Sequence, residues 1–507
     1  MILFINPRAT RPKNRRFPLS IMAVGAALPQ RITWEIIDGN LPGIDILACT
    51  QEWIDRRAGG KDPVRLLALT VMPGPQLASA VPLSKALKSL YPDIPIVWGG
   101  NFGSLYPAPV LNSGYVDWLI RGQGEQTFLE LLQVLDGDRD RKTVAGLAFR
   151  EADGSHWTAP ERVWLGPNDL PDPPYHKIDV NQYLHPTLLG RRSGVYQASI
   201  GCPFGCSFCG VISVFGRREM VQSPERTARN LDYLVRRHGM DSVHFYDNNF
   251  FLNEHHARDI AAAFEPLGIR WWCEARVDTL MRFSDQTWRA LKAAGLSMIF
   301  CGAESGSNDV LNKMNKGTTI EQIAGVAART RDHGIIPEFS FVFGGPDEPE
   351  QEIETTLNFI RQLKQINPAM ELISYFYTPT PQRSATYGNV DPLAGTPDNL
   401  DEWIHPEWIN WMTHEDPLVP WMDRALRAKV ADFETVLKCR FPSVNDVRTR
   451  AWGKIVGQLL ARRRWARGDY ADPRLLRHVQ RLSQKLPEDR QAYGHLRARG
   501  ADKSIRA

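Results

Sequence analysis

The first 140 residues alternate short apolar runs with stretches of helical periodicity. The apolar runs do not alternate with polar residues, which predicts strands buried on both faces of a parallel sheet. The predicted strands span residues 1–6, 32–37, 66–72, 94–98 and 118–120, and helices are predicted at 77–90 and from 126 to 135. This order predicts a doubly wound, Rossmann-like α/β domain over residues 1–140 that binds ligands beyond the carboxyl ends of its strands.

Residues 141–192 differ from this pattern and predict a connector. Two short apolar runs, at 144–150 and 156–163, flank Asp153-Gly154 and predict a hairpin. The following stretch, residues 167–175, is rich in proline, which cannot continue a helix or a central strand. We therefore place a domain boundary here.

Strand-like runs and capped helices repeat between residues 193 and 385. The runs at 196–200, 242–246, 270–277, 297–303, 337–343 and 371–378 predict six strands. Ser223, Ser284 and Thr319 are placed to open helices, and Gly239, Gly295 and Gly334 are placed to close them. Six such units predict a partial (β/α)6 barrel of the TIM type, whose chemistry lies at the carboxyl ends of its strands.

Residues 386–507 form a mainly helical, tryptophan-rich region, with helices predicted at 423–438 and 451–464. Trp403, Trp408, Trp411 and Trp421 lie close together in its first part. We expect them to pack the helices onto the barrel, and the alternative is an apolar lid over a substrate. The run Arg462-Arg-Arg464 predicts a solvated helix end, with a peripheral contact to acidic lipid as the alternative.

Composition narrows the class of protein. A chain of 507 residues is too long for one core and predicts two to four domains. The net charge of +4 is small for this length and does not favour nucleic acid as a partner. No apolar run reaches the roughly 18 residues that span a bilayer, and the N-terminus lacks the features of a signal peptide. Seven cysteines, odd in number, favour a reducing cytoplasm over a disulfide framework.

Three of those cysteines lie in one glycine-flanked loop, Gly201-Cys-Pro-Phe-Gly-Cys-Ser-Phe-Cys-Gly210. Cysteine thiolates hold iron–sulfur clusters, normally four to a [4Fe–4S] cluster, so Cys202, Cys206 and Cys209 predict a cluster with one iron left open. Phe204 and Phe208 would exclude water from it. A zinc site is the alternative, but it needs a fourth ligand that the sequence does not supply at a suitable spacing. Buried cysteines without any metal are a further alternative.

The spacing Cys-x-x-x-Cys-x-x-Cys after the first strand of a barrel resembles the signature of the radical S-adenosylmethionine superfamily. The resemblance implies a [4Fe–4S] cluster as metal site and S-adenosyl-L-methionine as cofactor. By position at the strand ends, it implies that S-adenosylmethionine is bound by Asp247, Glu274, Arg276, Glu304 and Ser305. Period-two alternation places Glu274 and Arg276 on one face of their strand. Salt bridges or loop-end hydrogen bonds are the alternative role for each of these residues.

Residues 1–140 resemble the cobalamin-binding domain of one class of these enzymes. The matching segments are Leu3-Phe-Ile-Asn-Pro7, Gly99-Gly100 and Val116-Asp-Trp-Leu-Ile-Arg-Gly-Gln-Gly-Glu125. The resemblance implies cobalamin contacts from Pro7, Thr70, Met72, Gly99, Gly100, Gln123, Gly124 and Glu125. Many such domains carry a cobalt-binding histidine in the loop after the first strand. Here residues 8–16 contain no histidine, so the lower face of the cobalt would be open to water or covered by another side chain, such as Met72.

Taken together, the resemblance implies a cobalamin-dependent radical S-adenosylmethionine enzyme. We expect it to C-methylate an unactivated carbon of a bulky, largely apolar small molecule, with electrons from an external flavodoxin- or ferredoxin-type reductant. A non-methylating oxidoreductase or cyclase, of the kind that closes a tetrapyrrole ring, is the alternative within the family. A non-catalytic, metal-stabilised binding or sensor protein is the alternative from another class. RNA is disfavoured as a substrate because no RNA-binding module or basic aromatic stripe is evident.

Overall fold

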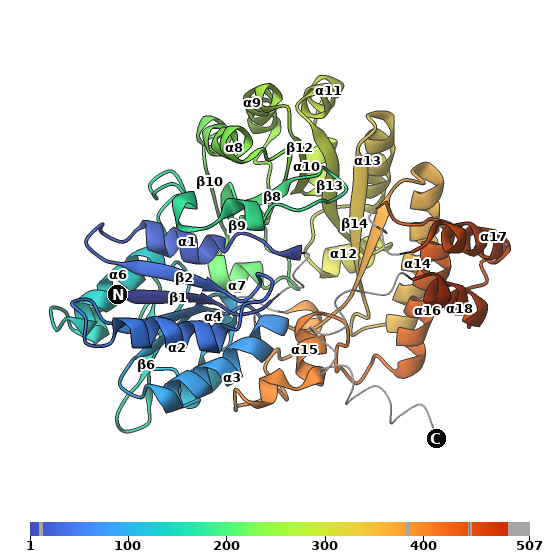
Figure 1. Cartoon of the computed structure of the whole chain (residues 1–507). Helices are drawn as coiled ribbons and strands as arrows, with labels where there is room; N and C mark the ends of the chain where they lie inside the picture. The colour runs from blue at the N-terminus through green and yellow to red at the C-terminus, as the bar shows by residue number, and fades with distance from the viewer. Residues whose placement is uncertain (10–13, 382–385, 445, 447–448, 485–507) are drawn as a thin grey trace.

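The computed structural model describes residues 1–9, 14–381, 386–444, 446 and 449–484. Two α/β units lie side by side, and a helical C-terminal region extends from the second (Figure 1). No helix among the described residues is long and apolar enough to cross a bilayer. The expected cytoplasmic location stays a prediction.

The first unit is a sheet of seven strands in the order β2-β1-β3-β4-β5-β6-β7. Its parallel strands are β1 (Ile2–Asn6), β2 (Trp34–Asp38), β3 (Leu66–Thr70), β4 (Ile96–Gly99) and β5 (Trp118–Ile120). Both faces of β1 are buried, with Leu3 and Ile5 in one core and Ile2 and Phe4 in another. Helices α2 (Ile46–Arg57) and α3 (Pro75–Leu90) cover the first face, and α1 (Leu19–Ala26) and α6 (Glu125–Leu135) cover the second. The doubly wound fold is therefore confirmed, because continuous apolar strands require helices on both sides.

The predicted hairpin forms, but it is not part of a separate connector. Its strands β6 (Leu147–Arg150) and β7 (His156–Thr158) add to the edge of the N-terminal sheet, with β6 antiparallel to β5. The sheet thus continues beyond residue 140, where we expected it to end. Leu147 and Phe149 supply buried side chains to the same core as β1, which explains why the hairpin joins this sheet.

The second unit is a six-stranded parallel sheet in the order β15-β14-β13-β12-β11-β8, an open barrel. Its strands are β8 (Ser193–Tyr196), β11 (Ser242–Phe245), β12 (Arg270–Glu274), β13 (Leu296–Glu304), β14 (Ile336–Phe343) and β15 (Glu371–Phe376). The surrounding helices are α8 (Pro224–His238), α9 (Glu254–Phe264), α10 (Val277–Met281), α11 (Asp285–Ala293), α12 (Asn308–Lys313), α13 (Ile320–Asp332) and α14 (Pro349–Ile366). The predicted caps form: the side chains of Ser223, Ser284 and Thr319 each accept a hydrogen bond from the first turn of their helix. The partial barrel is confirmed.

The first predicted barrel strand is the main departure. Residues 196–200 do not continue β8, because the chain leaves the sheet after Tyr196 and forms β9 (Ser199–Cys202), paired antiparallel with β10 (Arg218–Val221). Gly201 permits this pairing: its φ is +83°, and a Cβ there would lie 2.3 Å from the carbonyl oxygen of Arg218. The cysteine loop therefore leaves from a separate small hairpin at the barrel mouth.

The C-terminal region contacts both units. Helix α16 (Arg424–Arg440) packs on the barrel through Val430, Phe433 and Leu437, and α17 (Ala451–Arg467) and α18 (Arg474–Ser483) pack outside it. Trp421 also packs on the barrel. The expectation for the other tryptophans is wrong: Trp403 and Trp411, at η7 (Glu402–Ile404) and α15 (Pro406–Met412), are buried in the core of the N-terminal unit. This segment therefore links the barrel back to the first unit.

Trp403 is fully buried in that link. Its ring lies 4.6 Å from the ring of Tyr106 and 5.2 Å from that of Phe102, and its indole N–H donates to the carbonyl oxygen of Pro397. We expect Trp403→Ala to destabilise the protein by about 3–5 kcal/mol, because it opens a cavity and leaves a carbonyl without its donor. Denaturant unfolding followed by circular dichroism measures this. The half-buried Trp408 serves as the control, and a Trp408→Ala loss as large as that of Trp403→Ala would contradict the assignment.

Candidate active site

The cysteine loop joins β9 to the short helix α7 (Val211–Phe215) and is fastened to the loop after α12. The backbone N–H of Ser207 donates to the carbonyl oxygen of Met314 at 3.0 Å, and the Asn315 side chain donates to the carbonyl oxygen of Gly205 at 2.7 Å. Cys202, Cys206 and Cys209 are free thiols, with Cys206 buried and the other two half-buried. The loop thus presents three thiols from a fixed backbone.

Arg276 lies against this loop. It donates to the Cys206 sulfur at 3.7 Å and to the carbonyl oxygen of Lys316 at 2.5 Å, and its guanidinium lies 3.6 Å from the ring centroid of Phe204. The expected strand position is wrong, because β12 ends at Glu274 and Arg276 precedes helix α10. Because Arg276 lies beyond the end of β12, its side chain can reach the cysteine loop. Glu274 is the last residue of the strand and stays within the sheet.

Lys316 is a site residue that we did not predict. Its ammonium forms an ion pair with Glu304 at 2.7 Å, and both side chains are more than nine-tenths buried. Glu304 has a φ of +65°, an uncommon backbone for a non-glycine residue, and Gly302 leaves room for the pair, since a Cβ there would lie 2.0 Å from Glu304 Oε1. Lys316 also lies near the cysteines, where its charge acts on the thiols of Cys206 and Cys209. Arg276 and Lys316 therefore place two cations beside the cysteine loop.

We expect Lys316→Met to destabilise the protein by about 3–5 kcal/mol, because it leaves the carboxylate of Glu304 buried without its partner. The double variant Glu304→Gln/Lys316→Met removes both charges and should recover part of the loss. Urea unfolding of the three proteins checks this. Equal midpoints for the single and the double variant would contradict a stabilising pair.

The thiols fit a cluster better than a single ion. Burial raises the pKa of Cys209 to about 12 and that of Cys202 above its ordinary range, so thiolates form there only when a metal binds and displaces the protons. Arg276 and Lys316 suit the negative charge that three thiolates and a cluster bring. Throughout the described residues, no three His, Cys, Asp or Glu side chains converge closely enough to hold one metal ion. Among the residues that the structure describes, a zinc ion therefore has no set of ligands.

Two residues predicted to bind S-adenosylmethionine are fully buried and form hydrogen bonds with backbone groups. Asp247 accepts the backbone N–H of Ala198 at 3.0 Å, which holds the turn between β8 and β9, and burial raises its pKa to about 7. Ser305 accepts the N–H of Ser307 at 3.2 Å and lies within hydrogen-bond distance of Thr356. Both side chains therefore brace loops at the barrel mouth, and their contact with S-adenosylmethionine stays a prediction.

Glu274 faces the barrel interior. Strand register places it in one row with Phe300 and Glu338, and the indole N–H of Trp272 donates to Glu338 at 3.1 Å. Burial raises the pKa of Glu274 to about 8, assisted by the charges of Asp247 and Glu338, and burial raises that of Glu338 to about 7. Its backbone carbonyl accepts the N–H of Phe250 at 2.9 Å, but no hydrogen bond to its carboxyl group is found among the described residues. The alternation of side chains along β14 could have shown from the sequence that Glu338 faces the barrel interior. Its position, two strands from Glu274 with Phe300 between them, follows only from the strand register.

A cavity of about 490 Å³ lies between the N-terminal sheet and the barrel mouth. Seven of the eight residues predicted to contact cobalamin line it: Thr70, Met72, Gly99, Gly100, Gln123, Gly124 and Glu125. On the other side it is lined by Ile200, Val214 and Phe215, which flank the cysteine loop, and by Tyr246 of the barrel. Tyr246 packs at 6.1 Å on Trp272 inside the barrel. The cavity therefore connects the carboxyl edge of the first sheet with the cysteine loop and the barrel interior.

Glycines in the lining leave backbone of this cavity open to close approach by a ligand. A Cβ on Gly99 would meet nothing within 4 Å, whereas one on Gly100, at φ +99°, would lie 2.6 Å from the carbonyl oxygen of Val71. The turn at Gly100 thus forms only without a side chain, and Gly99 leaves backbone open to the cavity. Met72, next along the loop, is 44% exposed although it is apolar. That Met72 covers a face of a bound ligand stays a prediction.

Pro7 is the eighth residue and does not line the cavity. Its carbonyl oxygen accepts hydrogen bonds from the Gln76 and Asn40 side chains, at 3.0 and 3.3 Å, so it holds loops together behind the cavity. Its contact with cobalamin stays a prediction. The loop in which a histidine was missing spans residues 8–16, of which 10–13 lie outside the described residues.

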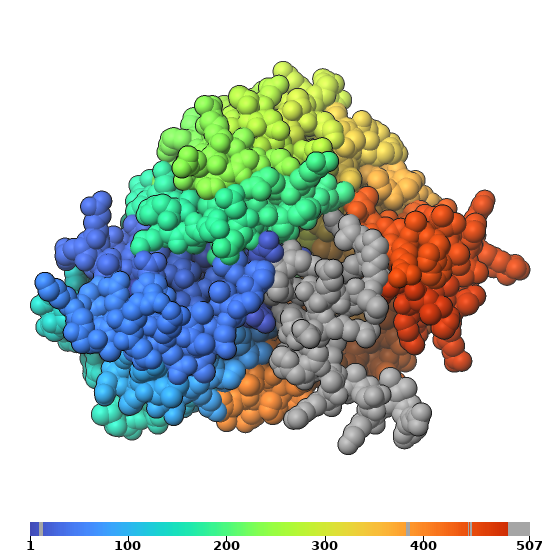
Figure 2. Space-filling model, viewed as in Figure 1, coloured from blue at the N-terminus to red at the C-terminus, as the bar shows by residue number. Residues whose placement is uncertain are grey.

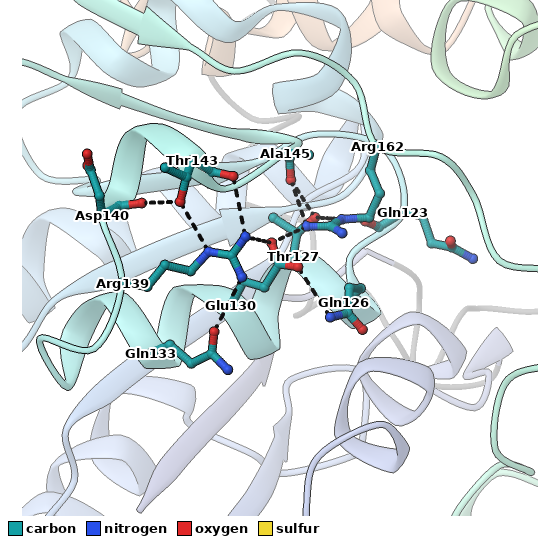
Figure 3. A network of polar contacts seen from close by, with 10 residues as sticks. All are labelled: Gln123, Gln126, Thr127, Glu130, Gln133, Arg139, Asp140, Thr143, Ala145 and Arg162. Atoms are coloured by element: carbon teal, nitrogen blue, oxygen red, sulfur yellow. Dashed lines mark hydrogen bonds and ion pairs between the residues drawn. The ribbon is translucent and has the colours of Figure 1, made fainter.

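The proline-rich segment forms part of the cavity wall. Trp164, Pro167 and Leu170 line it, and the Gln123 side chain bonds to both backbone groups of Leu165, at 2.7 and 3.0 Å. Figure 3 shows the network that fixes this segment on α6: Arg162 donates to Thr127 at 2.9 Å and pairs with Glu130, and Arg139 pairs with Glu130 at 3.4 Å. The segment that we predicted as a connector is therefore anchored and closes one side of the site.

Comparison with known proteins agrees with this arrangement. Residues 196–360 match the family model of the radical SAM superfamily. An uncharacterized methyltransferase of Pyrococcus horikoshii is 30% identical over 287 residues, which is 56% of this chain and 61% of that protein. An anaerobic magnesium-protoporphyrin IX monomethyl ester cyclase of Rubrivivax gelatinosus is 28% identical over 302 residues, 58% of this chain and 53% of that protein. The chain thus spans between half and two thirds of these curated relatives.

The fold is also that of a solved structure. The radical S-adenosylmethionine methyltransferase TsrM from Kitasatospora setae, with cobalamin and a [4Fe–4S] cluster bound, superposes with a TM-score of 0.59 at 19% identity. The superposition covers 74% of this chain and 71% of that one. At this identity the likeness concerns the fold, which includes both α/β units. The chain therefore carries a radical SAM domain and has the fold of the cobalamin-dependent radical SAM enzymes.

Proposed function

We propose that this protein is a cobalamin-dependent radical S-adenosylmethionine enzyme that methylates carbon. One observation supports this most: a single cavity is lined by the carboxyl edge of the N-terminal sheet and by residues on both sides of the cysteine loop. A ligand in the cavity would therefore lie next to a cluster on Cys202, Cys206 and Cys209. When bound, the cluster and S-adenosylmethionine supply a carbon-centred radical, and cobalamin supplies a methyl group.

The chain itself binds, orients and shields these groups. The three thiolates would hold the cluster and leave one iron for S-adenosylmethionine. Arg276 and Lys316 would balance its charge, and the rings of Phe204 and Phe208, which these cations contact, would keep water away. Glu274 would face S-adenosylmethionine or substrate from inside the barrel. Gly99 and Gly100 would admit the corrin, and Met72 would cover its lower face in place of a histidine.

We infer a small-molecule substrate that lies between the cavity and the barrel interior. Tyr246, Trp272 and Phe300 form an aromatic wall there, with ring centroids 6.1 Å apart between neighbours. This wall supports the expectation of a bulky substrate with a large apolar part. Glu274 and Glu338 lie on the same wall and would contact its polar part. An external flavodoxin- or ferredoxin-type protein would supply the electron.

Methylation is preferred over ring closure because the first relative above and TsrM are named methyltransferases. The cyclase relative supports the alternative of a non-methylating oxidoreductase, because one fold can serve more than one reaction. The two proposals differ in their products.

Cofactor content tests the proposal. After anaerobic reconstitution with iron, sulfide and hydroxocobalamin and removal of unbound material, we expect about four irons, about four sulfides and one cobalamin per chain. A full cluster with less than about a tenth of a cobalamin per chain would contradict the role of the cavity. Cobalamin without iron would contradict the role of the cysteine loop.

The raised pKa of Glu274 predicts a pH dependence of stability. Between about pH 4.5 and pH 8, the folded protein keeps a proton on Glu274 that the unfolded chain releases, so stability falls as pH rises, by up to about 1.4 kcal/mol per pH unit. Glu274→Gln removes this dependence. The stability of the variant relative to wild type should therefore rise from pH 5 to pH 8 and then level off, as measured by urea unfolding. The exposed Glu265, changed to Gln, is the control, and a Glu274→Gln difference that does not vary with pH would contradict the burial of its carboxyl.

A further inference from the structure

Helix α17 exposes an apolar stripe on the outside of the molecule. Trp452, Ile455, Val456 and Leu459 are 44, 58, 36 and 67% exposed. They lie at positions i, i+3, i+4 and i+7 and so form one face of the helix. Arg462, Arg463 and Arg467 are exposed on the continuation of the same stripe. The face is therefore apolar over its first two turns and basic over the rest.

Helix α18 packs against α17 and exposes apolar side chains of its own. It runs antiparallel to α17, since the backbone N–H of Arg450 donates to the carbonyl oxygen of Ser483 at 2.9 Å and Gly453 packs against Ser483. Leu475 and Leu482 are 59 and 58% exposed, and Arg481 lies beside Leu482. Figure 1 shows α17 and α18 at the edge of the molecule, and in Figure 2 the red atoms of this region form the edge away from the blue N-terminal unit. We call this exposed surface of α17 and α18 the C-terminal face.

The packing of the two helices does not need these side chains. Helix α17 packs inward through Gly453, Gly457 and Ala461, and α18 through Leu476 and Val479. The large apolar side chains point the other way, which costs hydration free energy unless another surface covers them. A solvated helix would carry polar residues at these positions.

The charge of the C-terminal face identifies its partner. Neither α17 nor α18 contains an aspartate or a glutamate. Four exposed arginines have no ion pair within the part of the chain that the structure describes: Arg462, Arg463, Arg467 and Arg481. Two neighbouring arginines beside the face do form ion pairs, Arg464 with Asp469 and Arg477 with Asp432. Arginines without acidic partners around exposed tryptophan and leucine are typical of helices that lie in the surface of an anionic bilayer. A second copy of the chain would instead bring the same positive charges together, which is unfavourable.

We propose that the C-terminal face docks the protein on anionic phospholipid membranes, independently of the proposed reaction. Trp452, Ile455 and Leu459 enter the boundary between headgroups and acyl chains, and the arginines contact lipid phosphates. The protein binds the surface and does not span it, in agreement with the absence of a bilayer-spanning helix among the described residues.

Vesicle sedimentation of the full-length protein tests this. With sucrose-loaded vesicles of phosphatidylcholine and phosphatidylglycerol at 3:1, we expect cosedimentation at moderate salt that is lost with pure phosphatidylcholine. Arg462→Glu/Arg463→Glu and, separately, Ile455→Ser/Leu459→Ser should each lower the partition coefficient at least about tenfold. The matched control is Arg236→Glu/Arg237→Glu on α8, an exposed pair with the same change of charge, which should leave binding within about twofold.

The remaining outcomes overturn the proposal. They are failure of the wild-type protein to bind the anionic vesicles, equal binding to neutral vesicles, and equal loss in the α8 control. Sedimentation velocity tests the alternative that a second copy of the chain binds this face. A wild-type protein that is a dimer, and that becomes a monomer in the Ile455→Ser/Leu459→Ser variant, would support that alternative and overturn the proposal. Circular dichroism of each variant shows that the helices remain folded, so that lost binding reports on the face.

Discussion

Cys206→Ala should abolish reductive cleavage of S-adenosylmethionine, lowering the rate of 5′-deoxyadenosine formation more than about 100-fold, and Cys202→Ala and Cys209→Ala should do the same. The loop contains three cysteines, one fewer than a [4Fe–4S] cluster normally has, so the loss of any one leaves the cluster with only two protein ligands. Loss of a residue that only supports a metal ligand costs about 10–100-fold, so loss of a ligand costs more. Iron and sulfide analysis, with the 5′-deoxyadenosine assay, measures both the cluster and its chemistry.

The control for this series is Cys49→Ala, another half-buried free cysteine, which lies on α2 away from the loop. It should keep full iron content and activity. If an alanine variant at 202, 206 or 209 retained iron and activity while its fold was intact, the cluster would not be held by this loop.

The second large effect concerns the cavity. Gly100→Ala should lower cobalamin affinity at least tenfold, which corresponds to about 1.4 kcal/mol or more. The new Cβ would lie 2.6 and 2.9 Å from the backbone oxygen and nitrogen of Val71, so the loop that carries Met72 must move. The left-handed φ of +99° adds strain for any residue but glycine. Equilibrium binding of hydroxocobalamin, followed by absorbance, measures the change.

Gly114→Ala is the matched control, because Gly114 has a similar backbone, at φ +74°, but open space around its Cβ position. It should lose stability from strain alone and keep cobalamin affinity. Equal affinity of the Gly100→Ala and Gly114→Ala proteins would show that the turn at Gly100 does not shape the cobalamin site.

Features set by nearby residues were predictable from the sequence. Strand burial follows from apolar runs, as in β1, and helix caps follow from single side chains, as at Ser223 and Thr319. The cysteine loop was recognisable because its three thiols lie within eight residues, and the cavity-lining glycines because they follow strands directly. The doubly wound unit and the partial barrel are therefore confirmed.

The errors concern contacts between segments that lie far apart in the chain. Lys316 pairs with Glu304 across a helix, and nothing near Lys316 in the sequence shows that its ammonium lies beside the cysteines. Asp247 and Ser305 lie after strand ends, as expected, but their hydrogen bonds to backbone N–H groups were not predictable from the sequence. Trp403 packs on Phe102 and Tyr106, about 300 residues earlier, so its core could not be inferred from its neighbours.

The central claim is tested most directly by one anaerobic turnover experiment. The reconstituted protein, with cobalamin, a reductant and candidate substrates, receives S-adenosylmethionine labelled with deuterium in its methyl group, and the products are resolved by mass. The structure predicts a product that has gained the labelled methyl group, together with S-adenosylhomocysteine and 5′-deoxyadenosine. Formation of 5′-deoxyadenosine and an oxidised or cyclised product, without S-adenosylhomocysteine or label transfer, would contradict methylation and favour the cyclase alternative.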